Sequence, residues 1–134
     1  MTGERTYAEV LDNLNGIGDW EWQPNGENLA IEVSPTTGNK IIHFINIVGG
    51  ETLPSIPIDS HSFNPDFAWS PDSRFIAVGR EVQVYEVATG QLVASVNIFG
   101  DVVLDWSRDG QYIAAGSTDG IVRIFDVSRI VSNN

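Results

Sequence analysis

Cysteine is absent from the 134 residues, so the chain can form neither a disulfide nor a thiolate metal site. Basic residues are scarce: 7 Lys and Arg stand against 18 Asp and Glu, a formal net charge of −11. Binding to nucleic acid or an anionic membrane relies on basic groups that neutralise phosphate, so we expect neither as a partner. No apolar run approaches the roughly 18 residues of a membrane span, and the acidic start is not a signal peptide. We therefore expect a cytoplasmic protein.

Groups with catalytic chemistry are also few. The two histidines, His43 and His61, lack metal-ligand spacing, and the sequence has neither a Gly-x-Ser-x-Gly nucleophile elbow nor a phosphate-binding glycine loop. We expect no enzymatic activity and no cofactor. Hydrophobic residues make up 42% of the chain, with four Trp and six Phe, which predicts a folded core rather than disorder.

Residues 103–127 contain the clearest pattern in the chain. Asp109-Gly110 and Asp119-Gly120 separate short runs rich in valine, isoleucine and aromatic residues. Asp-Gly between apolar runs is typical of tight hairpin turns, because glycine adopts positive φ without strain. The pattern predicts three antiparallel strands, at residues 102–107, 112–117 and 121–127. The third run is apolar on both faces, so such a sheet needs neighbours on both sides.

Weaker copies of this pattern occur twice upstream. The copies begin at Trp22, Trp69 and Trp106, which are 47 and 37 residues apart and bracket the roughly 40–45 residues of a four-stranded propeller blade. We expect these tryptophans to fill the space between blades, with Trp20 on the same side of its strand as Trp22. A third strand follows in each copy, at residues 40–47, 82–87 and 122–127.

These motifs resemble the WD-repeat (WD40) β-propeller family over nearly the whole chain. Residues 69–72 match the first turn of the family pattern, residues 116–120 match the second, and Phe125-Asp126 stands where the family has Trp-Asp. Tyr85-Glu86 is a looser copy of that pair. The family's Gly-His pair is missing from all three copies, so we interpret Asp119 as a turn residue rather than as part of a buried His–Asp network. The resemblance implies an all-β fold of four-stranded blades.

In this family the outermost strand of a blade follows a Thr-Gly turn. Here Thr89-Gly90 precedes a predicted strand at residues 91–98, and residues 51–58 are its equivalent in the first copy. Pro54 and Pro57 suit such an edge strand, because edge positions tolerate missing N–H donors. After the third copy, residues 128–134 are too short and polar for a fourth strand. Residues 4–11 instead have the register of an unused outer strand at the N-terminus.

The same N-terminal segment also fits a helix. Tyr7, Val10, Leu11 and Leu14 recur at helical spacing, so strand and helix both stay open for residues 4–14.

We therefore predict one WD40-like domain over residues 1–134. Its repeats cover about 12–58, 59–98 and 99–127, the last completed by strand 4–11 of another chain. Three blades cannot close a ring, so closure requires oligomerisation. Six blades as a homodimer are favoured, and nine as a homotrimer are the alternative. A fragment of, or partner to, a larger propeller protein is a further possibility. The predicted oligomer interface contains Thr6, Tyr7, Ala8, Val10 and Leu11 from one chain and Val122, Ile124 and Asp126 from the other.

The most distinctive predicted loop is residues 59–66. It contains three candidate contact residues for an unidentified protein or peptide, namely His61, Phe63 and Asn64. Arg80 is expected nearby and is the fourth candidate. An exposed aromatic ring beside an arginine is typical of a protein-binding hot spot. The primary hypothesis is thus a non-catalytic protein-interaction scaffold that assembles into a ring.

Two alternatives remain. Asp19, Asp66 and Asp101 could form a ring of carboxylates at the channel mouth, which would hold a hard cation such as Ca²⁺ or serve an enzymatic propeller. The chain could also be a designed or excised propeller fragment with no function beyond assembly.

Overall fold

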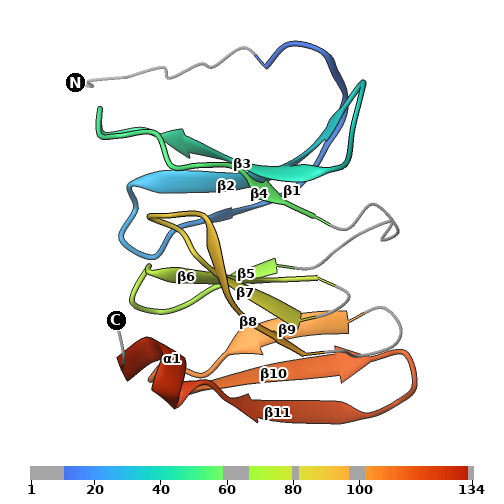
Figure 1. The fold of residues 1–134 in the computed structure, drawn as a ribbon, viewed down its shortest axis with the longest axis vertical. Helices are drawn as coiled ribbons and strands as arrows, with labels where there is room; N and C mark the ends of the chain where they lie inside the picture. Colours follow the sequence, from blue (N-terminus) through green and yellow to red (C-terminus); the bar gives the residue numbers. More distant parts are fainter. Residues whose placement is uncertain (1–10, 59–66, 80–81, 97–101, 133–134) are drawn as a thin grey trace, which may run out of the picture.

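The structure is a computed structural model and describes residues 11–58, 67–79, 82–96 and 102–132. These residues form three antiparallel β-sheets stacked along the long axis of the molecule (Figure 1). Sheet 1 contains β1 (Leu14–Trp22), β2 (Asn28–Pro35), β3 (Ile41–Asn46) and β4 (Ile56–Pro57). Sheet 2 contains β5 (Phe67–Trp69), β6 (Phe75–Val78), β7 (Val82–Glu86) and β8 (Gln91–Val96). Sheet 3 contains β9 (Val102–Trp106), β10 (Tyr112–Ser117) and β11 (Val122–Asp126).

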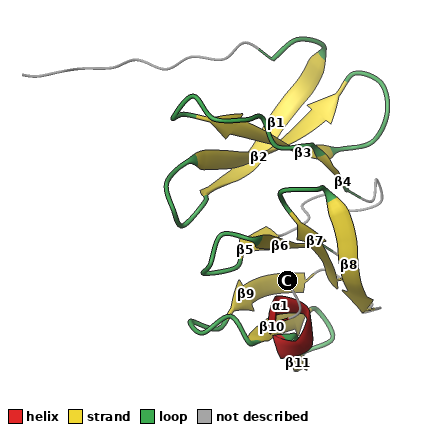
Figure 2. Ribbon diagram, turned by 60° about the vertical axis from the view of Figure 1, so that its left-hand side comes forward, coloured by secondary structure: helices red, strands yellow, loops and turns green. Residues whose placement is uncertain are grey.

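Each sheet is a meander in which strands pair in sequence order. Sheets 1 and 2 have four strands each, whereas the described part of sheet 3 has three, with β11 at its edge. The short helix α1 (Ser128–Ser132) follows β11 and lies beside sheet 3 (Figures 1 and 2). The predicted all-β fold is therefore confirmed, as is the prediction that no fourth strand directly follows β11 within the described residues.

The turns explain why the strands end where they do. Gly110 and Gly120 have φ values of 75° and 83°, in the left-handed region that glycine adopts without a Cβ penalty. The amide of Gly110 closes its turn by donating to the carbonyl of Ser107 at 2.9 Å, and Gly120 does the same to Ser117 at 3.0 Å. The two predicted Asp-Gly turns are confirmed.

The core is divided into two layers of side chains, one between each pair of neighbouring sheets. The layer between sheets 1 and 2 includes the fully buried Phe44 and Ile76, and the layer between sheets 2 and 3 includes Phe75 and Ile113. Burying each of these side chains contributes about 1.5–3 kcal/mol, so the stacking of sheets is a major source of stability.

Two expectations about element boundaries are wrong. The outer strand of sheet 1 is only Ile56–Pro57, because Pro54 and Pro57 cannot donate to the ladder; Ile58 adds one more bond, from its amide to the carbonyl of Lys40 at 2.9 Å. Leu14 is the first residue of β1, so the alternative helical pattern does not extend through it. Residues 1–10, which contain the rest of that pattern, lie outside the described residues.

Candidate functional site

The connections of each sheet lie at two opposite ends, because successive antiparallel strands reverse direction. The connections that enter β1, β5 and β9 share one end with those that join second and third strands. We call this end the loop face. The four residues predicted to bind a partner there lie outside the described residues, so their role stays a prediction: His61, Phe63, Asn64 and Arg80.

Of the predicted carboxylate ring, Asp66 and Asp101 also lie outside the described residues, and Asp19 is exposed in β1. Among the residues that the structure describes, no three His, Asp or Glu side chains are grouped so that they could hold a metal ion.

A cavity of about 320 Å³ opens on the loop face of sheet 1. It is lined by the segment that enters β1, including Leu11 and Asn13, and by the β2–β3 connection, including Thr36. The amide of Thr36 donates to the carbonyl of Asn13 at 2.8 Å, which ties the entering segment to that connection. Leu11 is half-buried here.

A second cavity, of about 290 Å³, lies at the opposite end, between sheets 1 and 2. Gln23 and Asn28 are buried beside it: the amide nitrogen of Asn28 donates to Gln23 Oε1 at 2.8 Å, and Gln23 Nε2 donates to the carbonyl of Ser73 at 3.0 Å. The Oδ1 atom of Asn28 has no partner among the described residues. Sequence reasoning missed this cavity. Its signal is that the other two copies have serine at the Gln23 position and aromatic residues at the Asn28 position.

One charged side chain is buried in the middle of sheet 1. Glu32 of β2 is 4% exposed and forms an ion pair with Lys40 at 3.3 Å. A Cβ on Gly18 would lie 2.9 Å from the carboxyl carbon of Glu32, so the absence of a side chain at Gly18 makes room for this carboxylate. The β1–β2 register shifts between Ile17 and Trp20, which places Gly18 inside the irregular stretch.

The repeat tryptophans connect neighbouring sheets through a recurring hydrogen bond. The indole nitrogen of Trp106 donates to the backbone carbonyl of Ala68 at 2.9 Å, and that of Trp69 donates to the carbonyl of Glu21 at 3.1 Å. In both cases the acceptor is the residue before the tryptophan of the preceding sheet. The ring of Trp69 also packs edge-on against Phe44, with centroids 5.6 Å apart.

Each sheet therefore has two distinct faces. The tryptophan face carries Trp22, Trp69 or Trp106 and points toward the preceding sheet. The alanine face points toward the following sheet and carries an alanine eight residues after the tryptophan: Ala30, Ala77 or Ala114. In all three sheets this alanine pairs with the residue before the tryptophan: Glu21 with Ala30, Ala68 with Ala77, and Asp105 with Ala114. The carbonyl of Asp105 therefore has the same position in its sheet as the two carbonyls that accept an indole hydrogen bond.

The predicted position of the tryptophans is confirmed for two of them. Trp69 and Trp106 are 5% and 7% exposed between sheets. Trp22 does not lie between sheets of the single chain: it is 52% exposed, because no described sheet covers the tryptophan face of sheet 1. Trp20, two residues earlier, is likewise exposed on β1.

The predicted oligomer interface is only partly within the described residues. Thr6, Tyr7, Ala8 and Val10 lie outside them. On the other side, Val122, Ile124 and Asp126 are exposed on β11, the edge strand of sheet 3.

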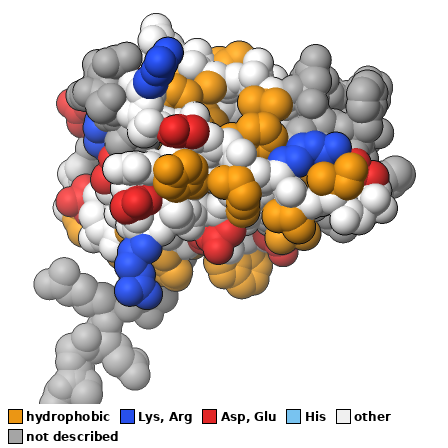
Figure 3. Space-filling model, turned by 90° about the horizontal axis from the view of Figure 1, so that it is seen from below, with side chains coloured by type: hydrophobic (Ala, Val, Ile, Leu, Met, Phe, Trp, Pro, Cys, Tyr) orange, Lys and Arg blue, Asp and Glu red, His pale blue; other side chains and the backbone are white. Residues whose placement is uncertain are grey.

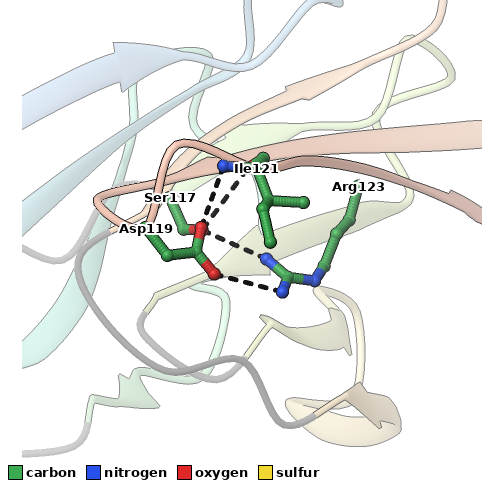
Figure 4. Close-up of polar contacts among 4 residues, drawn as sticks. All are labelled: Ser117, Asp119, Ile121 and Arg123. Carbon is green, nitrogen blue, oxygen red and sulfur yellow. Dashed lines mark hydrogen bonds and ion pairs between the residues drawn. The ribbon is translucent and has the colours of Figure 1, made fainter.

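The β10–β11 turn is held by a network around Asp119 (Figure 4). Its carboxylate accepts hydrogen bonds from the hydroxyl of Ser117, from the amide of Ile121 at 2.9 Å and from the guanidinium of Arg123 at 3.1 Å. These donors favour the charged form, with the Ser117 hydroxyl contributing most, and lower the pKa of Asp119 from 3.8 to about 2. Asp119 is thus a turn residue, as predicted.

The same serine–aspartate arrangement closes the turn after β9. The hydroxyl of Ser107 donates to Asp109 at 2.6 Å and accepts from the amide of Tyr112 at 3.0 Å, and the Ser107 hydrogen bond lowers the pKa of Asp109. These carboxylates are committed to holding turns.

Comparison with known proteins agrees with this geometry. The family described as WD domain, G-beta repeat (WD40) matches residues 88–126, the stretch that contains β8 through β11. The chain is 40% identical over 78 residues to a Poly(A)+ RNA export protein of Schizosaccharomyces pombe (strain 972 / ATCC 24843), covering 53% of this chain and 21% of that protein. It is also 40% identical over 65 residues to the WD repeat-containing protein SL1-17 of Schistosoma mansoni, covering 45% and 22%. The chain thus spans about a fifth of the length of these relatives.

Two solved structures share the fold. A chain of the Mitotic Checkpoint Complex superimposes with a TM-score of 0.70 at 18% identity, over 91% of this chain and 36% of that one. A chain of Kuenenia stuttgartiensis Hydrazine Synthase gives 0.65 at 17% identity, over 89% and 47%. Within the described residues, none of the helical structure is long and apolar enough to cross a membrane. The chain thus contains a matched WD40 repeat at residues 88–126, and in its stacked meanders it is similar to WD40-repeat β-propeller proteins.

Proposed function

We propose that this chain is a non-catalytic scaffold that binds a protein or peptide through its loop face. The observation that carries the proposal is the cavity of about 320 Å³ that opens on the loop face of sheet 1, between the segment that enters β1 and the β2–β3 connection. The WD40 repeat matched at residues 88–126 supports the same function by analogy, because repeat propellers present loops on a rigid frame.

The contact residues of this proposal are His61, Phe63, Asn64 and Arg80. Partners captured from a lysate by wild-type protein are compared by quantitative mass spectrometry with those captured by the Phe63→Ala/Arg80→Ala double variant. We expect a specific partner to be lost from the double variant and retained by Glu51→Ala, a control at the opposite end of sheet 1. Equal capture by all three proteins would remove the loop face from the proposal.

We further propose that copies of the chain assemble into a closed ring by strand addition. Residues 4–11 of one copy would pair with the edge strand β11 of another, two copies giving six blades and three giving nine. The position of β11 at the edge of sheet 3 supports this, since an edge strand presents unpaired N–H and C=O groups. The same interface residues as predicted from the sequence take part: Thr6, Tyr7, Ala8, Val10, Leu11, Val122, Ile124 and Asp126.

Sedimentation velocity measures this assembly directly. We expect a dimer or trimer at micromolar concentration, and a chain lacking residues 1–10 should assemble more weakly because the added strand is gone. A wild-type chain that remains monomeric would refute ring assembly. Unchanged assembly of the shortened chain would refute strand addition as its mechanism.

A further inference from the structure

The two sheet-to-sheet interfaces inside the chain are built in the same way. At each, a buried tryptophan from one sheet donates its indole N–H to the carbonyl before the tryptophan of the preceding sheet. Each interface also buries the alanine opposite that carbonyl, since Ala30 and Ala77 are both 0% exposed. The chain therefore contains two independent examples of how a tryptophan face meets an alanine face.

The outermost alanine face, on sheet 3, has the same chemistry as the two that are covered. Ile124 pairs with Ala114 on this face, in the position that Phe44 and Val84 occupy beside Ala30 and Ala77. Phe44 and Val84 are 1% and 2% exposed, whereas Ile124 is 62% exposed.

The next row along the strands repeats this contrast. Val122 pairs with Gly116 and is 68% exposed, whereas Ile42 and Val82 on the third strands of sheets 1 and 2 are 0% and 2% exposed. Figure 3, viewed from the sheet 3 end, shows hydrophobic side chains grouped across the middle of this face. The face is thus an inter-sheet surface that none of the described sheets covers.

The outermost tryptophan face, on sheet 1, is the complementary half. Trp22 pairs with Leu29 of β2, as Trp69 pairs with Ile76 and Trp106 with Ile113. Ile76 and Ile113 are fully buried with their tryptophans, but Trp22 is half exposed. Within the described residues, sheet 1 and sheet 3 therefore each present one half of the recurring interface to solvent.

We infer that the alanine face of sheet 3 is the docking surface for the tryptophan face of sheet 1 of a second copy of this chain, with the indole of Trp22 donating to the carbonyl of Asp105. The occupant is a second copy because the two free faces complement each other in the way that the covered faces already do. An acidic residue is compatible with the acceptor position, since Glu21 holds it in the interface between sheets 1 and 2. This inference rests on the ring assembly proposed above and names the surfaces that meet.

The contact is head-to-tail, because two different faces meet, and this makes it testable by complementation. Trp22→Asp disables the tryptophan face of sheet 1, and Ile124→Asp disables the alanine face of sheet 3. We expect each variant to self-associate at least about 30-fold more weakly than wild type, the effect of losing an interface hot spot. An equimolar mixture retains one intact pair of faces, from Trp22 of one variant and Ile124 of the other, and should form a heterodimer that grows no further.

Val48→Asp is the matched control, because Val48 is 61% exposed in the β3–β4 connection and belongs to neither face. Its self-association should equal that of wild type. Circular dichroism and thermal unfolding show whether each variant is folded. Tryptophan emission gives a second readout, since Trp20 and Trp22 are exposed in the single chain and should shift to shorter wavelengths on association.

The possible outcomes distinguish the proposed docking surfaces from ring assembly itself. A monomeric wild-type chain refutes ring assembly as a whole. If Trp22→Asp and Ile124→Asp self-associate as tightly as Val48→Asp, ring assembly is still supported, but the proposed docking surfaces are wrong. Loss of assembly in only one variant, without rescue in the mixture, indicates that like faces meet and also overturns the inference.

Discussion

The hydroxyl oxygen of Ser73 accepts a hydrogen bond from the backbone amide of Asn25 at 3.0 Å, across the boundary between sheets 1 and 2. Ser73 does so with a φ of 68°, a left-handed conformation that the other two copies assign to glycine, at Gly26 and Gly110. An L-residue in this region costs about 1–2 kcal/mol. The serine thus holds a strained turn that contributes a contact between sheets which glycine cannot make.

Replacement of Ser73 separates the strain from the hydrogen bond. Ser73→Ala keeps the strain and loses the bond, so we expect a loss of about 1 kcal/mol in the free energy of unfolding. Ser73→Gly loses the bond but relieves the strain, so its stability should be close to that of wild type. Urea unfolding measures both values.

Gly110→Ala is the matched control for the strain alone. Its Cβ would lie 3.7 Å from Pro71 Cδ, an ordinary contact, so only the φ of 75° opposes it. We expect a loss of about 1 kcal/mol. If Ser73→Gly were less stable than Ser73→Ala, strain at this turn would be disproved.

The buried indole hydrogen bond predicts a difference between two Trp→Phe substitutions. Trp106→Phe removes the donor to Ala68 and leaves a buried carbonyl without it, so the free energy of unfolding should fall by about 1–3 kcal/mol. Trp22→Phe changes an exposed ring and should have less effect on the single chain. Thermal and urea unfolding at concentrations below assembly provide the comparison. Equal losses would argue against a role for the indole bond.

The ion pair in sheet 1 predicts that the effects of replacing Lys40 and Glu32 on the free energy of unfolding depend on each other. Lys40→Met leaves the carboxylate of Glu32 buried without this partner, so we expect a loss of about 1–3 kcal/mol, reduced because Lys40 is itself a quarter exposed. Adding Glu32→Gln removes the buried charge and should restore part of the loss. Urea unfolding of both variants and the double variant gives the coupling. If the losses of the two single variants add up to that of the double variant, the two side chains contribute to stability independently of each other.

The Asp119 turn predicts a loss of stability in acid. Its pKa is lowered from 3.8 to about 2 in the folded chain, so the folded state binds fewer protons than the unfolded state between these values. The stability from this group is therefore complete above about pH 4 and is lost as the pH falls through about 2. Ser117→Ala removes the largest cause and should raise the pKa of Asp119. Carboxyl NMR titration measures it, and a wild-type value near 3.8 would contradict the assignment.

Local chemistry explains why much of the fold was predictable. The Asp109-Gly110 and Asp119-Gly120 turns follow from the conformational freedom of glycine and the hydrogen-bonding reach of a short carboxylate, both of which act within a few residues. Trp69 and Trp106 were placed correctly because their spacing reflects the repeat. The predicted edge at β11 also follows from counting strands along the chain.

Properties that depend on neighbouring sheets were not predictable in this way. The exposure of Trp22 depends on what covers sheet 1, and no residue near it in the sequence supplies that information. The cavity beside Gln23 and Asn28 forms only where two sheets meet at one end. The helix α1 was not predicted either, because its five residues are too few to show helical periodicity in the sequence. The candidate contacts on the loop face remain predictions.

The matched repeat, residues 88–126, begins just before β8, the outer strand of sheet 2, and ends with β11 of sheet 3. The unit that recurs in the sequence is therefore offset by one strand from the unit that folds. Each duplication of such a unit adds the last strand of one sheet and the first three strands of the next. When a propeller is lengthened by whole repeats, each sheet is therefore built from strands of two successive repeats. The number of repeats can then change without leaving a sheet inside the propeller short of a strand.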